Sequence, residues 1–119
     1  MDERYHALLE KVWHCALMAE KCATSCLTSE RIGELAPCIR LSFDCAETCM
    51  QLVRAVKRQS VLVPSLLRIC DYICQLCAEE CDKHEDDACQ QCAAACLLCS
   101  EACRKLTDDN KIPKSTSLM

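Results

Sequence analysis

Cysteine is the residue type in this sequence that could do chemistry, because it makes up 15 of the 119 residues. Thiolates are soft ligands that select Cu(I), Zn(II) and iron–sulfur clusters. A short cysteine-dense chain is more often a secreted disulfide scaffold. Here, however, the count is odd, and no basic region followed by an apolar stretch marks a signal peptide at the start. We therefore expect a cytoplasmic protein with reduced thiols that bind metal.

The cysteines follow a repeated spacing. One copy of the motif C-x3-C-x2-C-x3-C begins at Cys70, and a second begins at Cys92. Two further copies each lack one thiol, with Ala19 and Ser42 at the vacant positions, and Cys89 lies one step before the last copy. Steps of four and three residues keep side chains on one face of an α-helix. The candidate metal ligands are Cys15, Cys22, Cys26, Cys38, Cys45, Cys49, Cys70, Cys74, Cys77, Cys81, Cys89, Cys92, Cys96, Cys99 and Cys103.

Each copy predicts a helix whose inward face is lined by cysteine. We expect helices at about residues 3–27, 34–58, 64–84 and 86–106, with Pro37 and Pro64 in first turns. Short connections imply antiparallel neighbours, so the predicted fold class is all-α. It is an up-down-up-down four-helix bundle with a cysteine-lined core over residues 1–107. Residues 108–119 are polar and contain Pro113, and we expect them to form a flexible tail.

The two ends of this bundle should differ. At one end Cys26, Cys38, Cys81 and Cys89 should gather around a mouth, with His84 one helical step beyond Cys81. Towards the other end the cysteine faces continue into apolar residues, which predicts a hydrophobic plug. The expected interior is a thiol-lined tube, open at the mouth and sealed at the plug. The expected plug residues are Leu8, Val12, Leu52, Val56, Val63, Leu67 and Leu106.

Among the soft metals, Cu(I) fits this pattern best. Zinc prefers four ligands in a tetrahedron, and iron–sulfur clusters need four thiolates that loops usually supply. Two or three sulfurs satisfy Cu(I), and thiolates at positions i and i+4 can hold one ion between them. If each thiolate bridges two coppers, the capacity is on the order of a dozen Cu(I) per chain. Cys15, Cys38 and Cys89 would bind through partners on other helices. The six expected pairs are Cys22/Cys26, Cys45/Cys49, Cys70/Cys74, Cys77/Cys81, Cys92/Cys96 and Cys99/Cys103.

With these four C-x3-C helices, the sequence resembles the bacterial copper storage proteins, in the cytosolic branch that lacks an export signal. The resemblance covers about residues 10–106. It implies a four-helix bundle filled with Cu(I) on inward thiolates and assembled as a homotetramer. Metal is implied to pass through the mouth with the help of His, Met or acidic side chains, and His84 matches such a residue by position. The implied function is storage and sequestration of many Cu(I) ions in copper homeostasis and detoxification, with copper ions and a copper chaperone as partners.

Two alternatives remain open: a metallothionein-like zinc or cadmium buffer, and a thiol redox protein. Met18 is a second non-cysteine candidate ligand, although a Met on a helix flank more often packs. His6 and His14 are not candidates. No Ser-His-Asp set, activated Cys-His pair or Gly-rich loop is recognisable, so we expect no enzyme activity. A net charge of −4 argues against nucleic-acid binding, and the uncharged runs are too short to span a membrane.

Overall fold

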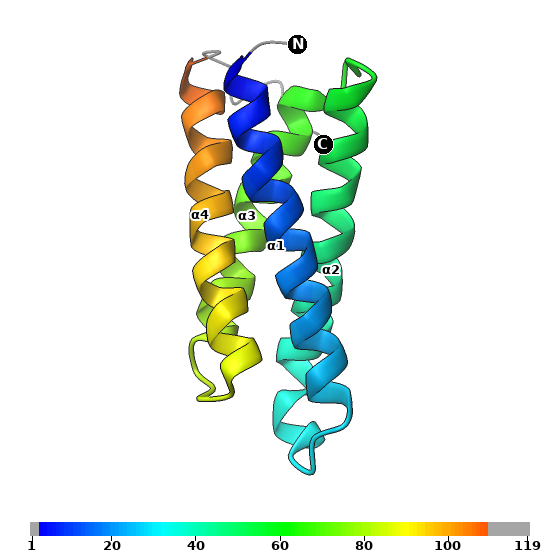
Figure 1. Cartoon of the computed structure of the whole chain (residues 1–119), viewed down its shortest axis with the longest axis vertical. Coiled ribbons are helices and arrows are strands. Elements are labelled where there is room, and N and C mark those ends of the chain that lie inside the picture. Colours follow the sequence, from blue (N-terminus) through cyan, green and yellow to red (C-terminus); the bar gives the residue numbers. More distant parts are fainter. Residues whose placement is uncertain (1–2, 110–119) are drawn as a thin grey trace.

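The computed structural model describes residues 3–109, and these residues form four helices (Figure 1). The helices are α1 (Glu3–Leu27), α2 (Ile32–Lys57), α3 (Val63–Cys81) and α4 (Asp87–Asp109), and no strand occurs within residues 3–109. Each helix is antiparallel to the next, α1 packs against α2 and α4, and α3 packs against the same two helices. The predicted all-α antiparallel bundle is confirmed.

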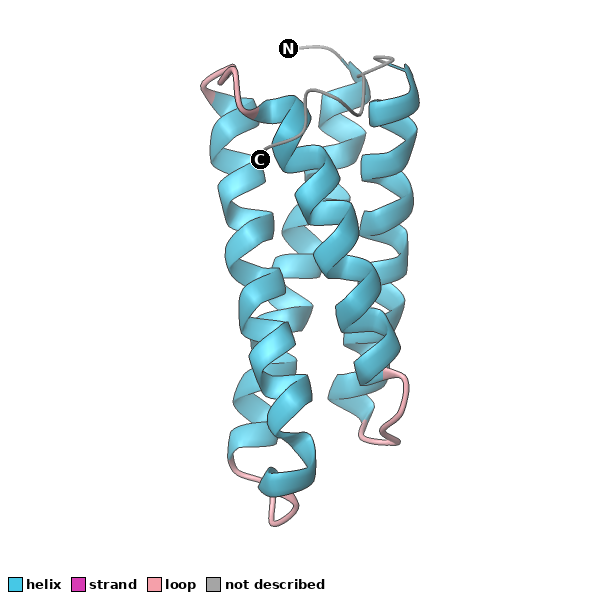
Figure 2. Ribbon diagram, turned by 180° about the vertical axis from the view of Figure 1, so that it is seen from behind, coloured by secondary structure: helices cyan, strands magenta, loops and turns pink. Residues whose placement is uncertain are grey.

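The loops divide the bundle into two ends. The α1–α2 and α3–α4 loops lie together at one end, which is the predicted mouth (Figure 2). The α2–α3 loop lies at the other end of the bundle, where α1 begins (Figure 1). At the mouth, the α1/α2 hairpin extends beyond the α3/α4 hairpin in both views. One side of the mouth is therefore longer than the other.

Helix boundaries differ from the prediction where short loops decide them. The third helix ends at Cys81 and not near residue 84, so His84 lies in the loop, where its backbone N–H bonds to the Cys81 carbonyl at 3.1 Å. The second helix begins at Ile32, which places Pro37 in its second turn and makes the first-turn prediction wrong. Pro37 leaves the Gly33 carbonyl without its usual donor, and the surrounding turn is exposed enough for water to replace it. Pro64 lies in the first turn of α3, as predicted.

The fourth helix continues to Asp109, beyond the expected domain boundary at 107. The rest of the expected tail, residues 110–119, lies outside the residues that the structure describes. The flexibility of that segment therefore stays a prediction.

The hydrophobic plug is present at the end that carries the α2–α3 loop. All seven expected plug residues are buried, and four of them (Val12, Leu8, Leu52 and Leu67) are at most 1% exposed. They stack on the same inward helix faces as the cysteines, because the apolar and thiol positions share one helical period. The plug closes that end of the core to water.

Candidate metal centre

The inward faces of the four helices bring all fifteen thiols into one core. Each cysteine is free and buried, and the most exposed of them, Cys26, has only 2% of its surface accessible. Many neighbouring Sγ atoms lie within 4.0 Å of one another. The others belong to groups in which every Sγ atom lies within 4.8 Å of the rest. The sulfurs therefore form one continuous set. We call this set the thiol column.

A layer in the middle of the column takes one cysteine from each helix: Cys15, Cys45, Cys74 and Cys96. The Sγ atom of Cys15 lies 3.7 Å from that of Cys45, 3.9 Å from that of Cys74 and 3.7 Å from that of Cys96. All four sulfurs lie within 4.8 Å of one another. These separations far exceed a disulfide bond of about 2.05 Å. The layer is a cage of four reduced sulfur atoms that could hold a metal ion.

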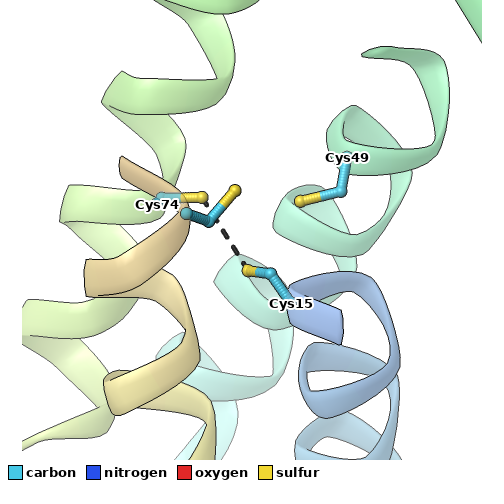
Figure 3. Close-up of side chains that lie close together, drawn as sticks. Cys15, Cys49 and Cys74 are labelled. Atoms are coloured by element: carbon cyan, nitrogen blue, oxygen red, sulfur yellow. Dashed lines mark hydrogen bonds between the residues drawn. The ribbon is translucent and has the colours of Figure 1, made fainter. Parts of the chain in front are cut away.

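The column continues towards the plug. Cys49 joins Cys15, Cys74 and Cys99 in another four-sulfur group, and Figure 3 shows Cys15, Cys49 and Cys74 projecting from three helices towards one another. The Sγ atoms of Cys49 and Cys99 each lie 3.8 Å from that of Cys70. Cys70 and Cys99 also form a group with Cys103, the last thiol before the plug.

The thiols at the mouth lie equally close together. Cys22 and Cys38 are 3.7 Å apart, Cys26 and Cys89 are 3.6 Å apart, and Cys38 and Cys81 are 3.3 Å apart. None is open to solvent, which corrects the expectation of an open tube. Cysteine thiols pack as small hydrophobic groups, so they close the channel on themselves when they are protonated.

Leu35 adds to this closure, and sequence reasoning missed it. It lies one turn beyond Cys38 on the same face of α2 and is fully buried. The signal was available, because position 35 continues the inward spacing of three residues from Cys38. An apolar side chain therefore lies at the mouth as well as at the plug.

The column adds sulfur contacts between helices to the expected C-x3-C pairs. Of the expected pairs, Cys77/Cys81 and Cys92/Cys96 lie 3.8 and 3.9 Å apart. The shortest sulfur contact, between Cys38 and Cys81, instead joins two helices. The three cysteines expected to bind across helices, Cys15, Cys38 and Cys89, do contact sulfurs on other helices. An ion held between sulfurs of different helices would therefore connect those helices to one another.

The mouth loops are held by polar contacts. The Nε2 atom of His84 lies 3.0 Å from a carboxylate oxygen of Glu80, with 12% and 15% of these side chains exposed. The side-chain amide of Gln90 donates a hydrogen bond to the His84 carbonyl at 2.6 Å. Arg31 and Asp86 form an ion pair at 2.5 Å that joins the α1–α2 loop to the α3–α4 loop. Hydrogen bonding to Arg31 lowers the pKa of the Asp86 carboxyl.

The remaining candidates lie away from the column axis. Met18 is partly buried and packs against the core. His6 and His14 are exposed on α1. His84 is held by Glu80 in its loop and does not continue the inward face of α3, because that helix has already ended.

The mouth thiols hold most of their protons. Burial raises the pKa of Cys26 and of Cys89 above the ordinary thiol value, because a buried thiolate loses its hydration. A hydrogen bond to Cys22, together with burial, raises the pKa of Cys38 to about 12. Hydrogen bonding with Cys38 and Cys81 lowers the pKa of Cys22. A cation that binds here must therefore displace protons.

None of the helices, over the residues that the structure describes, has both the length and the apolar character needed to cross a membrane.

Comparisons with known proteins give a consistent result. Residues 1–108 match the model of the copper storage protein family. The uncharacterized cysteine-rich protein YhjQ of Bacillus subtilis (strain 168) is 36% identical over 95 residues, which cover 80% of this chain and 88% of that protein.

Two solved structures share both the fold and the sequence pattern. The Cu(I)-bound copper storage protein BsCsp3 of Bacillus subtilis has a TM-score of 0.84 at 36% identity, covering 87% of this chain and 98% of its own. A cytosolic copper storage protein from Streptomyces lividans, solved with five coppers, has a TM-score of 0.86 at 29% identity, covering 89% and 93%. Because the family match spans nearly the whole chain and the thiol column fills the core, the chain belongs to the copper storage protein family.

Proposed function

We propose that this chain stores many Cu(I) ions on the thiolates of its core. The observation that carries the proposal is the thiol column, in which fifteen buried and unpaired cysteines form one continuous set. BsCsp3 has been solved with Cu(I) bound, and the Streptomyces lividans protein has been loaded with 10 copper equivalents. We assign the fifteen cysteines as the metal ligands.

Charge favours Cu(I) over a divalent metal in this core. One Cu(I) per thiolate leaves the column close to neutral, whereas four thiolates around one Zn(II) leave two negative charges. Burying uncompensated charge is costly, and among residues 3–109 no Lys or Arg is buried beside the column to offset it. A zinc or cadmium buffer is the second candidate function, and the titration below separates it from Cu(I) storage.

The test is a titration of the anaerobic, reduced protein with Cu(I) in competition with a chromophoric chelator. We expect saturation on the order of a dozen Cu(I) per chain, because about one metal per cysteine satisfies low-coordinate sites with bridging thiolates. Repeating the titration with Zn(II) is the matched control and should reach about four ions at most. Saturation at one or two Cu(I), or a preference for Zn(II) in direct competition, would contradict storage of Cu(I).

Two non-cysteine residues have different proposed roles. We propose His84 as a mouth ligand that assists the passage of copper, because Glu80 orients its ring by a 3.0 Å contact at the end of the bundle nearest the mouth thiols. Met18 is the weaker candidate, since its packing against the core already accounts for its position. Neither residue is needed for the capacity expected above.

We propose a store and not an enzyme, located in the cytoplasm. Catalysis by a thiol requires one cysteine with its own surroundings, whereas these cysteines share one buried environment. Fifteen unpaired thiols persist in a reducing compartment, and the Streptomyces lividans relative is described as cytosolic. Delivery by a copper chaperone fits the buried position of the sulfurs, because free Cu(I) has no exposed thiol to meet.

We also propose that copies of this chain form a homo-oligomer, a tetramer by the family resemblance. Trp13 and Leu17 lie one turn apart on α1 and remain 49% and 50% exposed. Phe43 on α2, 37% exposed, lies at the level of Leu17, because the flanking pairs Cys15/Cys45 and Cys22/Cys38 are in contact. Large apolar side chains left exposed on two neighbouring helices favour association with a second copy.

Analytical ultracentrifugation of the apo-protein should therefore give about four times the 13.4 kDa mass of one chain. The double variant Trp13→Glu/Leu17→Glu should shift the mass towards that of one chain, because two buried charges at each contact oppose association. The matched control Glu10→Gln changes an exposed residue of α1 and should leave the mass unchanged. A monomeric wild-type protein would overturn the proposal.

A further inference from the structure

The two residues that interrupt the cysteine repeat lie at one level of the bundle. Ala19 is on α1 and Ser42 is on α2, and both are fully buried. On one side of them Cys15 contacts Cys45 at 3.7 Å, and on the other side Cys22 contacts Cys38 at 3.7 Å. Two positions that look unrelated in the sequence therefore face the same layer of the core.

In that layer, thiols come from α3 and α4 but not from α1 and α2. The Oγ atom of Ser42 lies 3.8 Å from the Sγ atoms of both Cys77 and Cys81. Cys77 on α3 and Cys92 on α4, whose sulfurs are 3.8 Å apart, supply the sulfur of this layer. A methyl group and a hydroxyl replace the thiols that α1 and α2 supply in the layers above and below. Neither group is a soft ligand for Cu(I).

The layer divides the thiol column into two compartments. The mouth compartment consists of Cys22, Cys26, Cys38, Cys81 and Cys89. The inner compartment consists of Cys15, Cys45, Cys49, Cys70, Cys74, Cys96, Cys99 and Cys103. Cys77 contacts Cys81 at 3.8 Å on the mouth side, and Cys92 contacts Cys96 at 3.9 Å on the inner side. Cys77 and Cys92 therefore connect the two compartments.

Cu(I) moves through such a core by exchange between thiolates. A bare cation in an apolar interior is too costly, so each step must form one copper–sulfur bond as another breaks. The receiving thiol passes its proton to the thiolate that the copper leaves, which keeps the charge constant. The plug closes the other end, because its side chains are buried against one another. Copper that reaches the inner compartment from the mouth must therefore cross the layer that Ala19 and Ser42 interrupt.

We propose that Cys77 and Cys92 form a two-thiol neck that controls exchange of Cu(I) between the mouth compartment and the inner compartment. The store then has two pools: a mouth pool that loads and releases first, and an inner pool that exchanges more slowly. Ala19 and Ser42 are the residues that create the restriction. The inference rests on the proposed function, because it assigns an order to the filling of the same site.

The first test removes the neck and compares it with an equal loss of thiols elsewhere. The variant Cys77→Ala/Cys92→Ala has thirteen thiols, and so does the control Cys99→Ala/Cys103→Ala, which alters the end next to the plug. Loading from a Cu(I)–chelator complex is followed by stopped-flow absorption, and equilibrium capacity is measured separately. We expect the neck variant to fill its mouth pool normally and its inner pool about tenfold more slowly or worse, since each 1.4 kcal/mol of added barrier slows a step tenfold. The control should keep the wild-type rates with a smaller slow phase.

A gain of thiols provides the second test and does not depend on removing any ligand. The variant Ala19→Cys/Ser42→Cys completes the layer with four thiols. We expect it to bind about two more Cu(I) and to merge the two release phases into one when a strong chelator withdraws the metal. In the apo-proteins, unfolding by denaturant and the count of reactive thiols after unfolding confirm that each variant is folded and reduced.

The outcomes separate the neck from the store itself. Equal loading rates for the neck variant and its control, or two unchanged phases in the four-thiol variant, overturn the neck while storage stands. Saturation of the wild-type protein at one or two Cu(I) overturns storage, and the neck with it.

Discussion

Loading with Cu(I) is expected to raise the midpoint of thermal unfolding of this protein by tens of degrees. Each layer of the thiol column takes sulfurs from several helices, so an ion held between sulfurs of different helices connects segments that separate on unfolding. A ligand that binds only the folded state at a hundred times its dissociation constant stabilises it by about 2.7 kcal/mol. On the order of a dozen such sites far exceed the usual stability of a domain, which is about 5–15 kcal/mol. In a domain of this size, each 1 kcal/mol corresponds to several degrees.

Binding of Cu(I) to the unfolded chain makes the rise in the unfolding midpoint smaller but does not abolish it. C-x3-C pairs can still hold single Cu(I) ions after unfolding, and binding to the unfolded state lowers the net stabilisation. Contacts between helices, such as Cys38 with Cys81 at 3.3 Å, are lost entirely. The difference between the two states therefore comes from ligands on different helices.

Circular dichroism measures the shift in the midpoint of thermal unfolding as the ratio of Cu(I) to protein is raised. The samples are kept free of oxygen and contain a reductant that does not bind copper. The Cys99→Ala/Cys103→Ala variant is the matched control: it retains thirteen thiols and should show a smaller rise at saturation. Withdrawal of copper by a chelator should return the midpoint to the apo value. Equal midpoints for apo and loaded protein would mean that the ions do not bridge helices, and would contradict the assigned ligand set.

The helices and their inward faces were predictable because they depend on local spacing. Steps of four and three residues place Cys70, Cys74, Cys77 and Cys81 on one side of a helix, and all of them are buried. The same spacing predicts the plug, because Leu8 lies seven residues before Cys15 and Leu67 lies three residues before Cys70, on the same helix faces. Such patterns require no knowledge of a neighbouring helix.

The layers were not predictable in the same way, because they depend on how one helix is aligned with the next. The alignment of α1 with α2 is determined by a loop of four residues, and only this alignment places Ala19 opposite Ser42. Within the sequence the two residues are vacant positions in separate repeats. Spacing along one helix therefore predicts C-x3-C pairs, whereas layers that cross the bundle require the alignment of neighbouring helices.

The mouth departs from the prediction for a related reason. The expected position of His84 assumed that α3 continues past Cys81, but the helix ends there and a loop begins. Leu35 continues the inward spacing of α2 beyond Cys38 and is fully buried, and the sequence prediction extends the apolar positions only towards the plug. Helix ends depend on the contacts of a few loop residues, such as the Arg31–Asp86 ion pair, and periodicity does not encode those contacts.

Binding of Cu(I) is expected to release protons and to weaken as the pH falls. Cu(I) binds thiolates, and the mouth thiols hold their protons because burial raises the pKa of Cys26 and Cys89. Below the pKa of a thiol, the metal must displace a proton, so lowering the pH by one unit weakens binding about tenfold for each proton released. Above the pKa no proton is displaced and this dependence ends.

The raised pKa values place the dependence at an unusually high pH. An ordinary thiol, with a pKa of 9.0, has lost its proton above about pH 9 and no longer makes Cu(I) affinity depend on pH. Cys38, with a pKa of about 12, still holds its proton there and continues to make the affinity depend on pH. We expect affinity for the first Cu(I) ions to rise with pH through the whole range from 6 to 10.

A pH-stat titration at constant pH counts these protons directly. At saturation we expect about one proton per Cu(I), because about one metal is held per thiol. The first additions should release more than one, since an ion bound before the column fills takes two thiols for itself. Protein alkylated at its cysteines while unfolded is the control and should release none. Release near zero at pH 7 would mean that the apo column already consists of thiolates. That result would contradict the closed mouth as well, because adjacent thiolates repel one another and could not pack at 3.3–4.0 Å as the neutral thiols do.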